Sequence, residues 1–303
     1  MGFPAEEPAE EPADAPVTDT EARKPSVSKR RRRRRILRWV LVVAACYLTP
    51  VMTGCMNLST PVDYVMNLGT LSHDPTLKAP DDKVRRLVVL RHGLWRSAGA
   101  LWKLERALED HGYEVLNKSY PSTSGYIEDH TAMLKAELDE ALAQPDDRPV
   151  ELYFVGHSMG GLQVRYYVSS EGAHLPEACV FIATPHRGAA LTDARKDWLL
   201  FRWFLGTEAA VQLRPSHTFY DSLRPLTCDA GVIFGGRGDS DGHNDDIPGD
   251  DDGTVGVDEA QLPEAKDRIR LALGHTALSF ADEPIRQVLH FLKHRRFAHG
   301  ERK

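Results

Sequence analysis

A serine flanked by glycines is the residue of this sequence best suited to nucleophilic chemistry. Ser158 stands in Gly-His-Ser-Met-Gly, after the apolar run 152–155 and before the helix-like run 161–168. Side chains two positions before and after a serine in a sharp turn would collide, and glycine at Gly156 and Gly160 removes them. The strand, turn and helix together predict a nucleophile elbow, in which the first N–H groups of the helix point at the serine.

A serine needs a base, and an acid to orient that base, and in this arrangement they follow it in the order Asp, His. His275 comes just after an apolar strand candidate, where such a base is expected, and we interpret the other histidines as structural or surface residues. Asp252 ends an acidic loop and precedes a glycine, which favours a turn. Asp250 and Asp251 of the same loop are alternatives. We expect His275 to take the proton of Ser158 and Asp252 to hold the imidazole in the required tautomer.

The loop after an early strand is expected to complete the site. The strand candidate 87–91 ends in His92 and Gly93. In such an arrangement this loop and the residue after the nucleophile each supply a backbone donor to the developing oxyanion. The expected donors are the N–H groups of Leu94 and Met159.

The resemblance of this chain to a known family rests on His275 and four short motifs, Arg91-His92-Gly93-Leu94-Trp95, Gly156-His157-Ser158-Met159-Gly160-Gly161, Ala183-Thr184-Pro185-His186-Arg187-Gly188 and Asp251-Asp252-Gly253-Thr254-Val255. The chain resembles the bacterial lipases and esterases of the α/β-hydrolase superfamily over roughly residues 83–297. The resemblance implies hydrolysis of carboxylic esters, lipid or acyl esters in particular, through an acyl-enzyme and without an organic cofactor.

Two points limit what the resemblance implies. Arg91 departs from the family, in which many members carry a small or apolar residue before His-Gly, and it places a charge near the loop of Leu94. The superfamily also contains thioesterases and acyltransferases, so these activities are alternatives. A non-catalytic envelope binding protein with the same fold is a third reading.

Apolar strand candidates alternate with helical segments along the chain, which is typical of a doubly wound α/β domain with a mostly parallel sheet. The resemblance makes this an α/β-hydrolase fold, with its catalytic loops at the carboxyl ends of the strands. Residues 191–226, which we call the cap segment, interrupt the alternation with an apolar cluster at 198–205 and predict a short helical cap or lid. Strands are expected at 86–91, 113–118, 151–155, 179–183, 231–235 and 269–273, and helices at 97–111, 126–144, 159–170 and 284–294.

The N-terminal part of the chain is expected to lie outside the catalytic domain (residues 83–303). Residues 1–28 are rich in Pro, Ala and Glu and predict a disordered tail. Residues 29–55 join a basic block to a short apolar run, the pattern of an export signal, and end in a lipobox-like sequence whose Cys55 would be lipidated. An uncleaved signal anchor is the alternative, and both readings predict an exported protein held at a membrane. Residues 56–82 are interpreted as a linker.

The charge balance argues against a nucleic-acid partner. Of the 38 Lys/Arg and 44 Asp/Glu residues, residues 1–55 hold ten and seven, which leaves 28 basic and 37 acidic residues in the remainder. A body with this excess of negative charge repels phosphate backbones.

Two further groups of side chains leave alternatives open. Cys179 and Cys228 each precede a strand candidate, and they either form a disulfide, if those strands are neighbours, or stay as two thiols. A second acidic cluster has the spacing of oxygen ligands, so calcium is possible there, although a solvated loop is favoured and no other metal is expected. The cluster consists of Asp239, Asp241, Asn244, Asp245 and Asp246.

Overall fold

Six strands form one parallel sheet in the order β2-β1-β3-β4-β5-β6. The computed structural model describes residues 74–79, 83–194 and 208–300. The bounds of the strands are β1 Arg85–Arg91, β2 Glu114–Asn117, β3 Val150–His157, β4 Ala178–Ile182, β5 Asp229–Gly235 and β6 Asp267–Leu271. All five neighbouring pairs are parallel, as the alternation of strands and helices predicts.

The central strands are apolar because helices cover both of their faces. Every residue of β1 and of β4 is buried, and β3 is buried from Leu152 onward. The strand order reverses between β1 and β3, where Arg91 pairs with Gly156. Loops that leave the carboxyl ends of strands at such a reversal diverge and leave room for a ligand.

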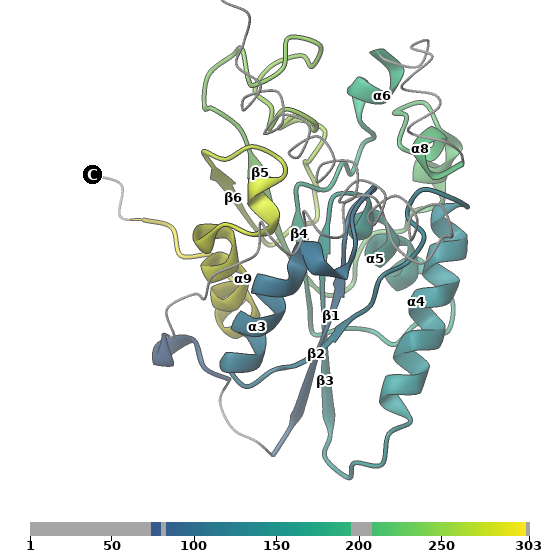
Figure 1. Ribbon diagram of the computed structural model, residues 1–303, viewed down its shortest axis with the longest axis vertical. Helices are drawn as coiled ribbons and strands as arrows, with labels where there is room; N and C mark the ends of the chain where they lie inside the picture. The colour runs from purple at the N-terminus through teal and green to yellow at the C-terminus, as the bar shows by residue number, and fades with distance from the viewer. Residues whose placement is uncertain (1–73, 80–82, 195–207, 301–303) are drawn as a thin grey trace, which may run out of the picture. The chain divides into compact units, whose positions relative to one another are not determined.

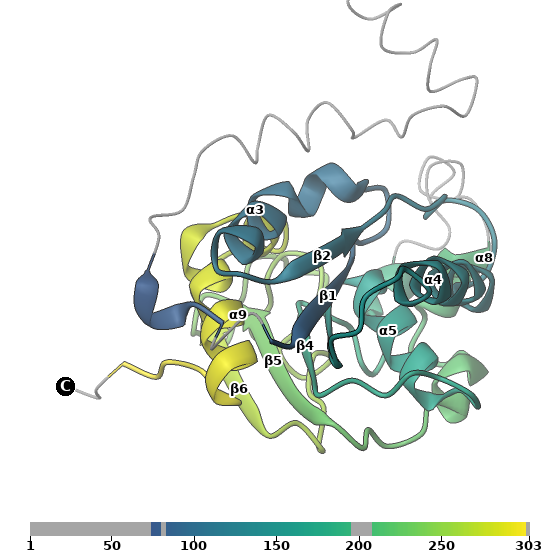
Figure 2. The same ribbon diagram turned by 90° about the horizontal axis from the view of Figure 1, so that it is seen from below.

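Helices α3 and α9 cover one face of the sheet, and α4 and α5 cover the other (Figures 1 and 2). The larger α-helices are α3 Trp102–Asp110, α4 Ile127–Leu142, α5 Met159–Ser169 and α9 Asp282–His294. The short α-helices are α6 Ala190–Ala194 and α8 Glu208–Gln212, and the 3-10 helices are η1 Pro75–Leu77, η2 Ala98–Leu101, η3 Thr218–Ser222 and η4 Ala277–Ser279.

Local sequence signals explain where two of these helices begin and end. Helix α4 opens with acidic residues, and the N–H of Tyr126 donates to the Asp129 carboxylate at 2.9 Å. Helix α9 has acidic residues in its first turn and Lys293 and His294 in its last turn, which suits the helix dipole. It ends at His294 and is followed by Arg295, a left-handed residue whose N–H donates to the Phe291 carbonyl.

The expected elements are present, with shifted boundaries. The helix predicted at 97–111 is divided into the 3-10 turn η2 and helix α3. The last strand, β6, ends at Leu271 rather than at 273, because its pairing with β5 runs from Gly231–Asp267 to Gly235–Leu271. The described part of the cap segment forms the short helices α6, α8 and η3, and α6 and α8 lie beyond the carboxyl ends of the strands (top of Figure 1).

Candidate active site

Ser158 occupies the sharp turn that the sequence predicts. Strand β3 ends at His157, α5 begins at Met159, and Ser158 between them has φ 55° and ψ −127°. Its N–H donates to the carbonyl of Ile182 on β4 at 2.8 Å. A non-glycine residue with positive φ is strained and is held in place only by its surroundings.

The flanking glycines are required by close backbone packing. A Cβ at Gly156 would lie 2.4 Å from the Cα of Gly161, and a Cβ at Gly160 would lie 2.2 Å from the carbonyl oxygen of Arg91. The turn therefore packs directly against its own helix and against the end of β1. Ser158 is only partly buried, so its side chain is accessible.

Asp252 and His275 form a hydrogen-bonded pair. The Nδ1 atom of His275 lies 2.8 Å from Oδ2 of Asp252, and the other carboxylate oxygen accepts from the N–H groups of Thr254 and Val255 at 3.0 and 2.8 Å. Burial alone would raise the pKa of Asp252, but His275 and the two amides outweigh it, and the pKa is lowered. The ionised carboxylate accepts a hydrogen bond from Nδ1–H of His275, which leaves Nε2 as the nitrogen without a proton.

The two alternative acids serve the loop itself. Asp250 accepts from the N–H groups of Arg237 and Gly238 and forms an ion pair with Arg270. Asp251 is fully buried and accepts from the N–H groups of residues 243, 244 and 253. Of the three aspartates, Asp252 is the one hydrogen-bonded to His275.

His157 connects His275 to the elbow. Its Nε2 lies 3.1 Å from the carbonyl oxygen of His275, and the two ring centroids are 4.9 Å apart. Burial lowers the pKa of His157 to about 3, so the ring is neutral and its Nε2–H donates. This contact places His275 beside the residue that precedes Ser158. No local pattern in the sequence indicates it, because the contact spans more than a hundred residues.

The loop that follows β1 lies against Ser158. A Cβ at Gly93 would lie 2.9 Å from the Cβ of Ser158, so only glycine fits there without displacing the serine. Within the described residues, the N–H groups of Leu94 and Met159 have no acceptor. The Met159 amide is free because it belongs to the first turn of a helix. Leu94 follows the glycine that packs against Ser158, and Met159 follows Ser158 directly, so two unused donors lie next to these residues in the chain.

Arg91 is fully buried, and its charge is balanced within the fold. Its Nη1 pairs with Oε2 of Glu137 at 2.8 Å, and its Nε donates to Oε1 of Gln163 at 3.1 Å. Its guanidinium carbon lies 4.6 Å from the centroid of the Tyr120 ring. The departure from the family pattern at Arg91 is therefore compensated on helices α4 and α5, which the sequence alone could not reveal.

An apolar cluster joins the candidate oxyanion residues to the cap segment. Met159 packs with buried side chains of the cap segment and of the region after β2, and Leu94 packs against the same cluster. Its fully or largely buried members are Tyr120, Ile127, Met159, Leu162, Leu213 and Phe219. An apolar cluster thus adjoins the two residues that are expected to supply the oxyanion donors.

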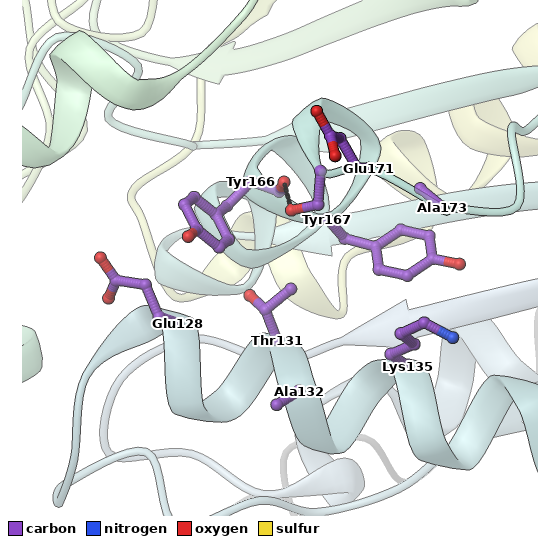
Figure 3. Close-up of a pocket in the computed structure, with 9 residues that line it drawn as sticks. Glu128, Thr131, Ala132, Lys135, Tyr166, Tyr167, Glu171 and Ala173 are labelled. Atoms are coloured by element: carbon purple, nitrogen blue, oxygen red, sulfur yellow. Dashed lines mark hydrogen bonds between the residues drawn. The ribbon is translucent and has the colours of Figure 1, made fainter.

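A cleft of about 210 Å³ between α4 and α5 is separate from this site (Figure 3). Tyr166 and Tyr167 of α5 line it together with Thr131 and Lys135 of α4, and neither Ser158, Asp252 nor His275 takes part. We assign no function to it.

Cys179 and Cys228 are two free thiols whose sulfur atoms lie 3.6 Å apart. Their strands are neighbours, as the disulfide hypothesis requires, since Ala178 of β4 pairs with Asp229 of β5. The structure thus brings the thiols together without joining them.

The acidic loop is organised by its own backbone. Asp239 accepts from the N–H groups of Asp241 and Gly242, and the Asn244 side chain accepts from the N–H of Asp246. Within the described ranges, no three His, Cys, Asp or Glu side chains come together in a way that could hold a metal ion.

Several sequence-based expectations fall outside the described residues. They are the tail 1–28, the signal or anchor 29–55 with Cys55, most of the linker 56–82 and the apolar cluster 198–205. In the part of the chain that is described, no helix combines the length and the apolar character needed to cross a membrane.

Comparison with known proteins shows the same fold in solved structures. Among solved structures, the mature form of a lipase from Bacillus licheniformis has a TM-score of 0.51 at 18% identity, covering 75% of this chain and 96% of that one. Its propeptide form has a TM-score of 0.55 at 18% identity, with coverages of 78% and 54%. At this identity the likeness shows a shared fold. No curated protein matches the chain.

A family model matches most of the catalytic domain of this chain. The model described as the alpha/beta hydrolase family matches residues 87–290, which include Leu94, Ser158, Asp252 and His275. The match extends over more than half of the sequence. The chain therefore belongs to the α/β-hydrolase family.

Proposed function

We propose that this protein is a serine hydrolase that cleaves carboxylic esters through an acyl-enzyme. The observation that carries the proposal is the hydrogen bond between Asp252 and His275, together with the contact of His275 with the residue that precedes Ser158 in its strained turn. In such a pair the carboxylate orients the imidazole and stabilises its protonated form.

The proposed reaction uses atoms of this chain only. His275 Nε2 takes the proton of Ser158 while Oγ attacks the ester carbonyl carbon, and the resulting oxyanion accepts from the amides of Leu94 and Met159. The protonated His275 then gives its proton to the departing alkoxide, which leaves an acyl group on Ser158. Water, deprotonated by His275, then attacks this acyl group. As the acid leaves, His275 returns the proton to Oγ of Ser158. No metal and no organic cofactor has a step in this scheme.

The apolar cluster favours esters with an apolar acyl group. Leu94 and Met159 contact aromatic and aliphatic side chains that continue into the cap segment, including Leu213 and Phe219. A carbonyl held by these two amides would place its acyl chain beside that surface. The similar structures from Bacillus licheniformis are those of a lipase, which supports a lipid or acyl ester as the substrate class.

The test measures hydrolysis of p-nitrophenyl esters of increasing chain length by the full-length protein. Ser158→Ala and His275→Ala are expected to abolish turnover, and a fluorophosphonate probe is expected to label Ser158. Ser240→Ala, which changes an exposed loop serine, is the control and should keep both activity and labelling. Absence of labelling in folded wild-type protein would contradict the proposal and favour a non-catalytic binding protein.

Two alternative enzymes with the same site are separated by changing the acceptor and the leaving group. An acyltransferase would convert the acyl-enzyme to an ester when an alcohol is added, in excess of the acid formed. A thioesterase would cleave the thioester of a given acyl group faster than its oxygen ester.

Export and membrane attachment are part of the same proposal. They rest on the basic block, the apolar run and Cys55 in residues 29–55. Incorporation of a labelled fatty acid in cells, lost in Cys55→Ser, is the expected result for a lipoprotein. An unlabelled protein that stays in the membrane fraction would favour the uncleaved anchor.

A further inference from the structure

The segment that follows β2 runs along the loop that follows β1, and several hydrogen bonds join the two. The N–H of Ala98 donates to Oγ of Ser119 at 2.9 Å, and the N–H of Trp95 donates to Oγ of Ser122 at 3.1 Å. Between them, the hydroxyl of Tyr120 donates to the carbonyl of His92 at 2.6 Å. The segment after β2 thus holds the loop that follows β1, which contains Leu94 and is called the loop of Leu94 below.

Tyr120 and His92 contact each other through their rings as well. The rings are stacked, with centroids 4.2 Å apart and planes at 17°, and the N–H of Tyr120 donates to Nε2 of His92. Burial lowers the pKa of His92 to about 3, so the ring is neutral. With Nε2 as an acceptor, Nδ1 carries the proton and donates to the carbonyl of Gly93 at 2.9 Å.

These bonds fix two successive peptide groups. Tyr120 holds the carbonyl of His92, and the His92 ring holds the carbonyl of Gly93. In a planar trans peptide the N–H points opposite to the carbonyl of the same group. The direction of the Gly93 carbonyl therefore sets the direction of the Leu94 N–H. Helix α5 confines the same loop, because the carbonyl oxygens of Arg91 and His92 pack against Gly160 in its first turn.

Arg91 also contacts the ring of Tyr120. Its guanidinium lies over the Tyr120 ring and is held by Glu137 of α4 and Gln163 of α5. Tyr120 is itself almost fully buried, and its ring contacts both the His92 ring and the Arg91 guanidinium. The network links the loop of Leu94 to both helices on this face of the sheet.

We propose that Tyr120 is a positioning residue, which holds the Leu94 N–H in the direction that an oxyanion on the substrate requires. The proposal rests on the proposed function, because it assigns Leu94 as an oxyanion donor. It gives Arg91 and Glu137 a supporting role through Tyr120. It also explains what the buried charge of Arg91, at which this chain departs from many relatives, contributes to the site.

The test is Tyr120→Phe in the full-length protein, which removes one hydroxyl and keeps the ring. We expect kcat per fluorophosphonate-titrated serine to fall roughly ten- to a hundredfold, below the loss caused by deleting an oxyanion donor outright. KM should stay unchanged, and the inhibition constant of a trifluoromethyl ketone, whose adduct carries an oxyanion, should rise in parallel with the loss in kcat.

The control is Tyr167→Phe, which also removes a buried hydroxyl. Tyr167 accepts from the N–H of His174 at 2.9 Å and lines the cleft of Figure 3, and it belongs to a different apolar cluster from the one that Leu94 packs against. Both variants lose one hydrogen bond, so both should lower Tm by a similar amount. A merely structural role for Tyr120 would give the same kinetics in the two variants, and that result would overturn the proposal.

The outcomes separate this proposal from the proposed function. Wild-type protein without esterase activity or serine labelling would remove the basis of both. Active wild-type protein with an unimpaired Tyr120→Phe variant would overturn the positioning role alone. If Tyr120→Phe does not fold, Glu137→Gln decides, since glutamine keeps an acceptor for Arg91. The expected result is a smaller fall in kcat with unchanged KM. An unchanged kcat in Glu137→Gln would overturn the proposal.

Discussion

His275 and Asp252 are joined twice, once through their side chains and once through their backbones. The ring Nδ1 lies 2.8 Å from the Asp252 carboxylate, and the backbone N–H of His275 donates to the Asp252 carbonyl, also at 2.8 Å. The backbone bond anchors the His275 loop to the residue that orients its ring. A substitution that changes only the carboxylate should therefore leave the loop in place.

Asp252→Asn is expected to lower kcat by about 10³- to 10⁴-fold, because an amide favours the wrong imidazole tautomer while keeping the side chain's shape. KM should change little. Steady-state kinetics on protein whose active serine has been titrated would measure the effect. Asp250→Asn is the matched control, since Asp250 binds the backbone at 237–238 and Arg270. An equal loss in Asp250→Asn would contradict the assignment of Asp252.

The sheet and the elbow could be predicted from the sequence because their signals are local. Apolar runs of strand length alternate with helical segments, and the glycines around Ser158 report a steric requirement within five residues of chain. The position of His275 follows from its place after the last strand. The choice of Asp252 over Asp250 and Asp251 needed the loop's backbone, which decides which carboxylate faces the ring.

The supporting contacts could not be predicted, because they join residues far apart in the chain. Arg91 meets Glu137 and Gln163 only once β1 lies beneath α4 and α5. The sequence shows an unusual charge at Arg91 and nothing of its partners. The contact of His157 with His275 likewise depends on the order of strands in the sheet.

The free energy of unfolding should fall as the pH decreases from about 6.5 to about 3. His92 and His157 have folded-state pKa values of about 3, below the ordinary value of 6.5. Between these values the unfolded chain binds protons that the folded chain does not, so acidification favours unfolding. Each of the two should contribute about 1.4 kcal/mol per pH unit within this window. Buried His186 acts in the same direction.

Denaturant titrations at a series of pH values would measure this slope. His157→Gln removes one titrating group and keeps a donor for the His275 carbonyl, so the slope should become shallower by about one proton. An unchanged slope would show that His157 does not stay neutral in the folded protein.

Gly160→Ala is expected to reduce both stability and activity. The new Cβ would lie 2.2 Å from the Arg91 carbonyl oxygen and 2.4 Å from that of His92, so the backbone must move. Overpacking of this kind costs roughly 1–3 kcal/mol, and the displacement would carry the Leu94 amide with it. Gly172→Ala provides the comparison.

Gly172 has φ +73° and no neighbouring atom within 4 Å of an added Cβ. Its substitution should cost about 1–2 kcal/mol through backbone strain alone and leave kcat unchanged. Denaturant unfolding and titrated kcat, measured on both variants, would separate the two effects. A fully active Gly160→Ala variant would contradict the tight packing of the elbow against β1.

Oxidation is expected to join Cys179 and Cys228. With oxidised glutathione, the more exposed Cys228 attacks as a thiolate and releases one glutathione, and Cys179 then displaces the second. The hydrogen bond from Cys179 lowers the pKa of Cys228, which suits Cys228 as the attacking thiol.

The disulfide would close a loop that contains the whole cap segment, and the chain-entropy relation gives about 4 kcal/mol of stabilisation for a loop of this length. Peptide mapping should show a cross-linked pair of peptides, two hydrogens lighter than the free thiols, and Tm should rise on oxidation. Cys228→Ala should show neither change. Persistence of a glutathione adduct on Cys228, with Cys179 still open to alkylation, would mean that the buried sulfur of Cys179 cannot reach the mixed disulfide, despite a separation of 3.6 Å between the thiols. Alkylation of both thiols would show that neither reacts with oxidised glutathione, and that the two cysteines serve the core as packing residues only.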